Sequence, residues 1–174
     1  MLPIFDIRTN TFGEQKVIRL FLAIYIASHI IFSVSAQANQ ATPWGVAEKS
    51  DYKYEPQKVL YDLTTGNKND LLNILDRVGL LYKLYDSDLF ESSIVVIIHG
   101  DTIPFFSTAN PANLELMKRA YNFTVGAPIE FRMCQAAAKA MGYKPKDIHG
   151  FVKMVPMADA EIVKLQKEGY AYMQ

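Results

Sequence analysis

The sequence is short of cysteine, of histidine and of net charge. It contains one cysteine, Cys134, in 174 residues, which excludes a disulfide within the chain and any disulfide-stapled scaffold. Its 18 basic and 18 acidic side chains cancel and form no basic cluster, which disfavours nucleic acid as the main partner. The three histidines and the cysteine show no zinc-type spacing, so we expect no metal, and we predict no organic cofactor.

The N-terminal segment does not have the pattern of a folded domain. Three basic residues between Arg8 and Arg19 precede an apolar run, Leu20–Val34, and an A-x-A step follows at Ala36–Ala38. This pattern predicts a secretory signal peptide over residues 1–38 and a periplasmic or secreted mature protein. The alternative is an uncleaved anchor that holds the protein to the membrane, because about 18 apolar residues span a bilayer. In an oxidising compartment a lone cysteine is free, modified or shared with another chain.

The remainder of the sequence alternates between strand-like and helix-like segments. Residues 39–57 are polar and aperiodic, which predicts a linker or N-terminal arm. Strands are expected at 58–63, 94–98, 127–133, 150–156 and 170–173, and helices at 67–85, about 112–123, 134–142 and 157–169. The unbroken β-branched run Ile94–Ile98 is typical of a central strand covered on both faces. We therefore expect one domain, residues 58–174, with a three-layer α/β/α architecture and a mainly parallel five-stranded sheet.

Ligands of parallel sheets bind beyond the carboxyl ends of the strands, and the first such end is the loop Leu63–Asn67. Its sequence, "LTTGN", allows two interpretations. It is either an ordinary strand-to-helix turn or a flavin phosphate loop that uses backbone N–H groups at a helix N-terminus. The turn is favoured because Lys68 and Asn69 stand where a further hydroxyl is usual. Asn67 or Asn69 is expected to cap the helix.

The second strand end is "IIHGD", where His99 follows the central strand. An imidazole there can act as an acid or base near neutral pH. The alternative is structural, with His99 bonded to the next loop while Gly100 permits a tight turn. The structural interpretation is favoured, and His99 is a secondary candidate for catalysis.

The third strand end carries Cys134, at the boundary between a strand and a helix. A helix N-terminus offers unsatisfied N–H groups and the positive end of the helix dipole, both of which favour a thiolate. The thiolate is the nucleophilic form of cysteine. Free cysteines are also among the most buried residues, so a packing role is the alternative. Arg132 and Lys139 would add positive charge near the sulfur, unless strand alternation points Arg132 away from it.

Three segments, Val95–Asp101, Gly126–Tyr143 and Val152–Gln174, occur in an order that resembles the DsrE/DsrF-like sulfur-relay family. The likeness is greatest to a branch with an "LQ-x-EGYAY" tail, and it spans about residues 58–174. The resemblance implies a flavodoxin-like fold and assembly into homotrimers or homohexamers. It also implies that Cys134 carries sulfur as a persulfide, while no role is transferred to His99.

These observations lead to one functional hypothesis and two alternatives. The hypothesis is an exported sulfur carrier or sulfurtransferase that accepts sulfane sulfur on Cys134 from an unidentified donor and passes it to an unidentified acceptor. The first alternative is a non-enzymatic oligomeric binding or assembly module of the same fold, in which Cys134 packs in the core. The second, less favoured, is a flavin-binding protein.

Overall fold

The computed structural model describes residues 44–86 and 90–174. The expected signal peptide, residues 1–38, lies outside the described residues. The chain divides into two units, Met1–Ser50 and Asp51–Gln174, and all the helices and strands given below belong to the second. Residues 44–57 hold no helix or strand. Within the described residues, no helix has both the length and the apolarity needed to cross a membrane.

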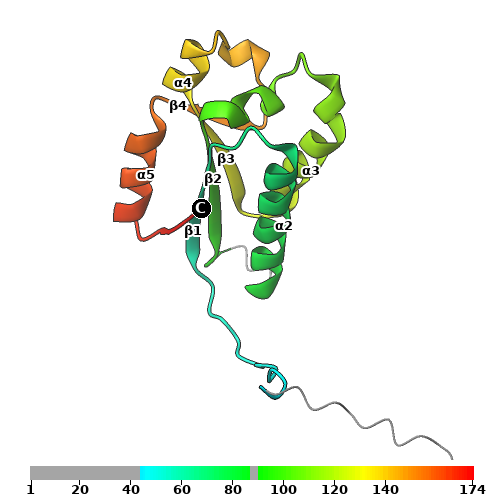
Figure 1. Ribbon diagram of the computed structural model, residues 1–174. Helices are drawn as coiled ribbons and strands as arrows, with labels where there is room; N and C mark the ends of the chain where they lie inside the picture. The colour runs from blue at the N-terminus through cyan, green and yellow to red at the C-terminus, as the bar shows by residue number, and fades with distance from the viewer. Residues whose placement is uncertain (1–43, 87–89) are drawn as a thin grey trace, which may run out of the picture. The chain divides into compact units, whose positions relative to one another are not determined.

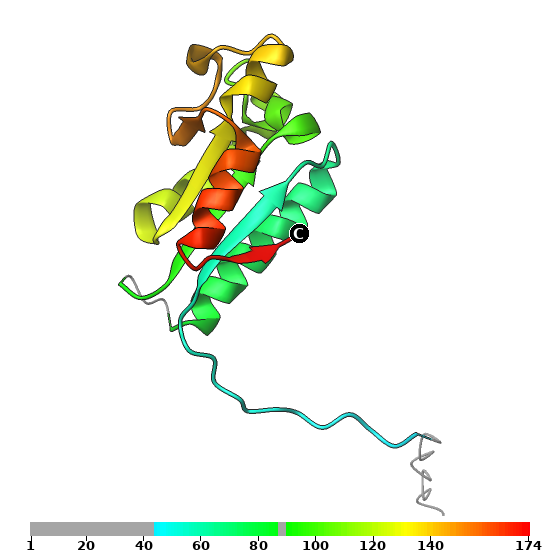
Figure 2. The same cartoon turned by 90° about the vertical axis from the view of Figure 1, so that its left-hand side faces the viewer.

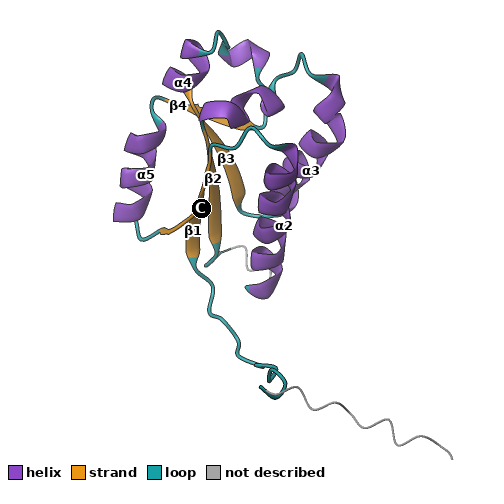
Figure 3. Ribbon diagram, in the orientation of Figure 1, coloured by secondary structure: helices purple, strands orange, loops and turns teal. Residues whose placement is uncertain are grey.

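A five-stranded parallel sheet forms the centre of the second unit (Figure 3). The strands are β1 (Lys58–Leu63), β2 (Ser93–Ile98), β3 (Ile129–Cys134), β4 (Val152–Val155) and β5 (Ala171–Met173). Their order across the sheet is β4-β3-β2-β1-β5, and each neighbouring pair is parallel. The run Ile94–Ile98 is fully buried in β2, as expected for a central strand whose β-branched residues face helices on both sides.

Helices cover both faces of this sheet (Figure 1). They are α2 (Lys68–Leu84), α3 (Leu114–Gly126), α4 (Gln135–Ala140) and α5 (Ala158–Lys167). From β1 to β4 the chain advances in one direction, whereas the last connection returns from β4 to the far side of β1. Because such crossovers keep one hand, reversing the direction places α5 on the face opposite α2 and α3. The α/β/α flavodoxin-like architecture expected from the sequence is confirmed.

Short 3-10 helices complete the connections. They are η1 (Gly100–Phe106), η2 (Pro111–Asn113) and η3 (Pro145–Asp147). The sequence pattern did not predict η1, because its internal Pro104 argues against an α-helix but is tolerated in a short 3-10 segment. The helix expected from about residue 112 starts at Leu114, after η2.

Two hydrophobic clusters lie on opposite faces of the sheet. In the larger cluster, alternate residues of the β-strands pack against α2 and α3. The smaller, here called the α5-side core, consists of Leu60, Val95, Ile97, Cys134, Ala158 and Leu165. In Figure 2, α5 lies over the sheet on this side, and β5 runs beside β1. The sole cysteine therefore belongs to the α5 face of the sheet.

Candidate functional site

The carboxyl ends of β1, β2 and β3 bring three polar side chains to the α5 face of the sheet. Successive strand residues point to opposite faces, and Leu60, Ile97 and Cys134 all belong to the α5-side core. Asp62 and His99 each lie two residues beyond Leu60 and Ile97, so they share this face with Cys134.

Cys134 ends β3 and caps α4. Its backbone is extended, with φ −64° and ψ 111°, and its Sγ accepts a hydrogen bond from the backbone N–H of Ala137 at 3.4 Å. The residue is 5% exposed. This placement agrees with the strand-to-helix boundary expected from the sequence.

His99 follows directly after β2, the strand next to β3 in the sheet. Its backbone is extended, with φ −152° and ψ −179°, and its N–H donates to the carbonyl of Leu63 at 3.0 Å, so the ladder of β2 continues through it. The β2–β3 register ends with the pair Ile98 and Met133, and His99 and Cys134 are the residues that follow them. Neighbouring strands lie about 4.8 Å apart. The imidazole and the thiol therefore occupy one edge.

A hydrogen-bonded chain, not anticipated from the sequence, joins His99 to β1 and β5. The Nε2 atom of His99 lies 2.6 Å from Oδ1 of Asp62, and the hydroxyl of Tyr172 donates to Oδ2 of Asp62 at 2.6 Å. The bond to Asp62 raises the pKa of Tyr172, and partial burial adds to the effect. The one sequence signal for Asp62 was a carboxylate within the apolar run "KVLYDL". Nothing in the sequence paired it with Tyr172, which lies 110 residues away.

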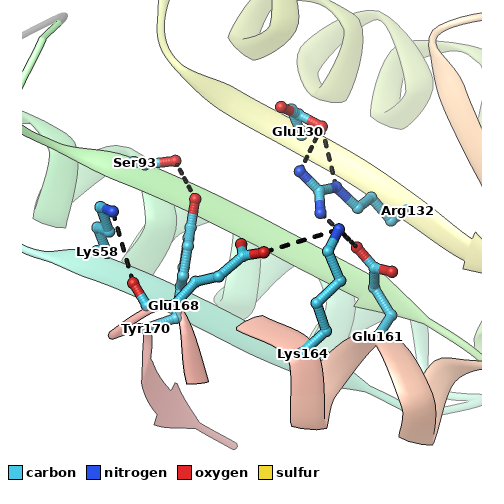
Figure 4. Close-up of polar contacts among 8 residues, drawn as sticks. All are labelled: Lys58, Ser93, Glu130, Arg132, Glu161, Lys164, Glu168 and Tyr170. Atoms are coloured by element: carbon cyan, nitrogen blue, oxygen red, sulfur yellow. Dashed lines mark hydrogen bonds and ion pairs between the residues drawn. The ribbon is translucent and has the colours of Figure 1, made fainter. Parts of the chain in front are cut away.

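Arg132 lies on the same face as Cys134, but its charge is already paired (Figure 4). Its guanidinium donates to Glu130 at 2.9 Å and to Glu161 of α5 at 2.5 Å. Burial opposes the charge on Arg132, but the bonds to Glu161 and Glu130 outweigh it and raise its pKa. The expectation that Arg132 adds positive charge at the sulfur is therefore weakened, because two carboxylates offset that charge. Lys139 is exposed on α4.

The loop Leu63–Asn67 has the geometry of a capped turn. The side chain of Asn67 accepts a hydrogen bond from the N–H of Asn69 at 2.8 Å, which makes Asn67 the N-cap of α2. The hydroxyl of Thr65 accepts from the N–H of Asn67 and donates to Asp70, both at 3.0 Å. The hydroxyl of Thr65 and these two N–H groups, which a phosphate would need, are thus bonded within the turn.

Three clefts in the described part of the chain lie away from Cys134. One of about 530 Å³ is formed by α2 and the end of α3. Two others, of about 330 and 370 Å³, are both lined in part by Phe151. None of the three is lined by Cys134, His99 or Asp62. Among the described residues, no group of three His, Cys, Asp or Glu side chains is arranged to hold a metal ion.

Comparisons with known proteins agree with this architecture. A family model described as the DsrE/DsrF-like family matches residues 65–174. A solved protein of unknown function from Methanobacterium thermoautotrophicum is similar at 20% identity and a TM-score of 0.58, over 67% of this chain and 97% of that chain. At this identity the likeness concerns the fold alone. No curated protein matches the chain.

Proposed function

The chain belongs to the DsrE/DsrF-like family, whose membership indicates sulfur relay in general, and we propose that it carries sulfane sulfur as a persulfide on Cys134. One observation carries this proposal: the sole cysteine is the N-cap of a helix at the carboxyl edge of a parallel sheet, with its sulfur accepting a backbone N–H. In this architecture that edge is where ligands bind.

The proposed transfer takes place in two balanced displacements. The Cys134 thiolate attacks the outer sulfur of a donor, a new S–S bond forms, and the old bond breaks with its electron pair leaving on the donor. An acceptor thiolate then attacks the outer sulfur of the persulfide and releases the Cys134 thiolate. Neither step needs an external oxidant or reductant, and both follow the pattern of thiol–disulfide exchange.

The burial of Cys134 is compatible with this chemistry. The bond between two sulfur atoms is about 2.05 Å long, so the transferred sulfur stands beyond a thiol that is itself only 5% exposed. The inner sulfur belongs to a buried residue of the α5-side core. Such burial limits attack to the outer atom, which is the one to be passed on.

His99 supplies the proton transfers in this scheme. It shares the α5 face of the sheet with Cys134 and directly follows β2, the strand next to β3. As a base it accepts the proton of the Cys134 thiol, and as an acid it returns a proton to the departing donor. An imidazole is suited to both steps because its ordinary pKa lies near neutrality.

A second candidate function is a binding or assembly module in which Cys134 has a packing role. The observation that favours it is the burial of Cys134 in the α5-side core, since free cysteines often serve as small apolar residues. Under this alternative the thiol of the folded protein does not react, so the two functions differ in a direct chemical measurement.

Mass spectrometry of the intact folded protein tests the proposal. After incubation with polysulfide or thiosulfate, we expect an addition of about 32 Da per sulfur that dithiothreitol removes and Cys134→Ser abolishes. His99→Gln should slow loading by roughly 10²-fold, whereas His149→Gln, a matched change at the other described histidine, should leave the rate unchanged. A thiol that neither gains sulfur nor reacts with alkylating reagents before unfolding would favour the binding module.

Export and assembly belong to the same proposal. The pattern of residues 1–38 supports cleavage and a periplasmic or secreted protein, with a retained anchor as the alternative. The family resemblance supports a homotrimer or homohexamer. N-terminal sequencing of the protein recovered from the producing cell, and light scattering of the purified protein, test the two statements separately.

A further inference from the structure

We infer that Asp62 and Tyr172 are positioning residues that fix the imidazole of His99, so that the strand β5 is part of the sulfur-transfer machinery. The inference rests on the proposed function and deepens it. It extends the site from Cys134 and His99, which the sequence indicated, along the hydrogen bonds from His99 through Asp62 of β1 to Tyr172 of β5.

The contacts around Asp62 leave its carboxylate little freedom. Its side chain is 11% exposed, Oδ1 is bonded to Nε2 of His99 and Oδ2 to the hydroxyl of Tyr172, both at 2.6 Å. Rotation of the carboxylate would lengthen one or both bonds. Because the two partners hold different oxygens, the Tyr172 hydroxyl fixes the direction in which Asp62 meets the imidazole.

This arrangement selects one tautomer of His99. An ionised carboxylate can only accept hydrogen bonds, so Nε2 of His99 carries the proton that faces Asp62. In the neutral ring the lone pair is then on Nδ1, because the bond made by one ring nitrogen sets the state of the other. Nδ1 is thus the ring nitrogen left to accept and return the proton in the proposed transfer, and Asp62 offsets the charge of the imidazolium formed between these steps.

The backbone explains how β5 reaches the site. The β1–β5 register pairs Leu60 with Tyr172, so Tyr172 and Asp62 lie two residues apart along one face of the paired strands. β5 is only three residues long, and the Nη1 of Arg77 donates to the carbonyl of Gln174 at 3.1 Å. Pairing with β1 and this bond to α2 hold the tyrosine in place.

The chain offers a matched pair of tyrosines for the test. Tyr172→Phe removes the hydroxyl bonded to Asp62, whereas Tyr170→Phe removes the hydroxyl of the residue two positions earlier, which lies 2.8 Å from the Oγ of Ser93. The titratable group bonded to the His99 ring is Asp62 of β1, and Tyr172 of β5 acts through Asp62. Asp62→Asn is the stronger variant, because an amide presents a donor as well as an acceptor to the ring.

Two readouts on the full-length protein separate the possible results. Imidazole ¹⁵N NMR reports the tautomer of His99 without any sulfur donor, with His149 as an internal reference. We expect the Nε2–H form in the wild type, a mixture in Asp62→Asn and Tyr172→Phe, and no change in Tyr170→Phe. The rate of persulfide formation and its pH midpoint should change in the same two variants, by roughly tenfold in rate for Tyr172→Phe, the scale of one hydrogen bond to a charged group.

The inference is overturned if Tyr172→Phe leaves both the tautomer and the pH profile of loading as in the wild type, or if Tyr170→Phe changes them equally. A wild-type protein that takes up no sulfur counts against the proposed function instead. The NMR readout then still decides whether β5 positions His99, because it involves no transfer of sulfur.

Discussion

The sulfur of Cys134 lies 3.4 Å from the backbone nitrogen of Ala137 and accepts its hydrogen bond. The residue proposed to carry sulfur thus also satisfies an N–H of the first turn of α4 that would otherwise lack a helical partner. Chemistry and helix capping are therefore combined in one side chain, and different substitutions should separate them.

Cys134→Ser and Cys134→Ala should differ in stability but agree in chemistry. Serine is a preferred N-cap, so its capping bond should offset the lost apolar burial and keep the free energy of unfolding within about 1 kcal/mol of the wild type. Alanine cannot accept the bond and should be less stable than serine by about 1 kcal/mol. Urea unfolding measures the difference. Both variants should fail to gain sulfur, and an adduct on either would show that Cys134 is not the carrier.

The capping position of Cys134 could be predicted from the sequence, whereas the surroundings of the thiol could not. A change from the apolar run "APIEFRM" to an alanine-rich segment marks the boundary within a few residues. That Arg132 shares the face of Cys134 follows from a spacing of two along a strand. Its pairing with Glu161 depends on which face α5 covers, and this is fixed only when the last connection reverses direction across the sheet.

The hydrogen bonds that link Tyr172, Asp62 and His99 show the same limit of prediction from the sequence. Each residue was visible at or near the end of an expected strand, but their proximity requires β5 to pair with β1 and β2 to lie on the other side of β1. Strand periodicity predicts which residues share a face of one strand, not which strands are neighbours. Periodicity therefore places His99 at a strand end but does not predict the residues that hold its imidazole.

Arg132 makes two ion pairs, one with Glu130 within β3 and one with Glu161 of α5, and they should be unequal in strength. The side chain of Glu161 is 12% exposed and that of Glu130 52% exposed. Glu161→Gln therefore removes the more buried of the two carboxylates that offset the charge of Arg132. We expect a loss of about 2–3 kcal/mol for Glu161→Gln, less than for a fully buried pair because Glu130 still contacts the guanidinium. Glu130→Gln should cost less than about 1 kcal/mol. Chemical denaturation measures both, and equal losses would contradict this ranking.

Gly100 is expected to require the absence of a side chain. Its φ is +56°, a left-handed conformation that residues with a Cβ rarely adopt, so Gly100→Ala should cost about 1–2 kcal/mol through backbone strain. Gly126 is the matched control because it ends α3, has no atom within 4 Å of a built Cβ and no positive φ. Gly126→Ala should be neutral or slightly stabilising. Thermal unfolding distinguishes the two, and a neutral Gly100→Ala would show that the turn after His99 adapts.

Stability should fall in alkaline solution because three tyrosines ionise less readily in the folded chain. Burial raises the pKa of Tyr61 and of Tyr85 above the ordinary 10.0, and the hydrogen bond to Asp62, together with burial, does the same for Tyr172. Above about pH 10 the unfolded chain therefore binds fewer protons than the folded one. The stabilising contribution is complete below pH 10 and is lost as pH rises through the folded-state pKa values.

Unfolding free energies measured in urea from pH 8 to pH 11, with tyrosinate absorbance followed in parallel, test this pH dependence. Tyr85→Phe keeps the buried ring and removes one titrating group, so the decline above pH 10 should become shallower. Tyr54→Phe alters an exposed ring before β1 and should leave the slope as it is. A wild-type curve that stays flat to pH 11 would contradict the expected linkage, since raised folded-state pKa values require a negative slope in that range.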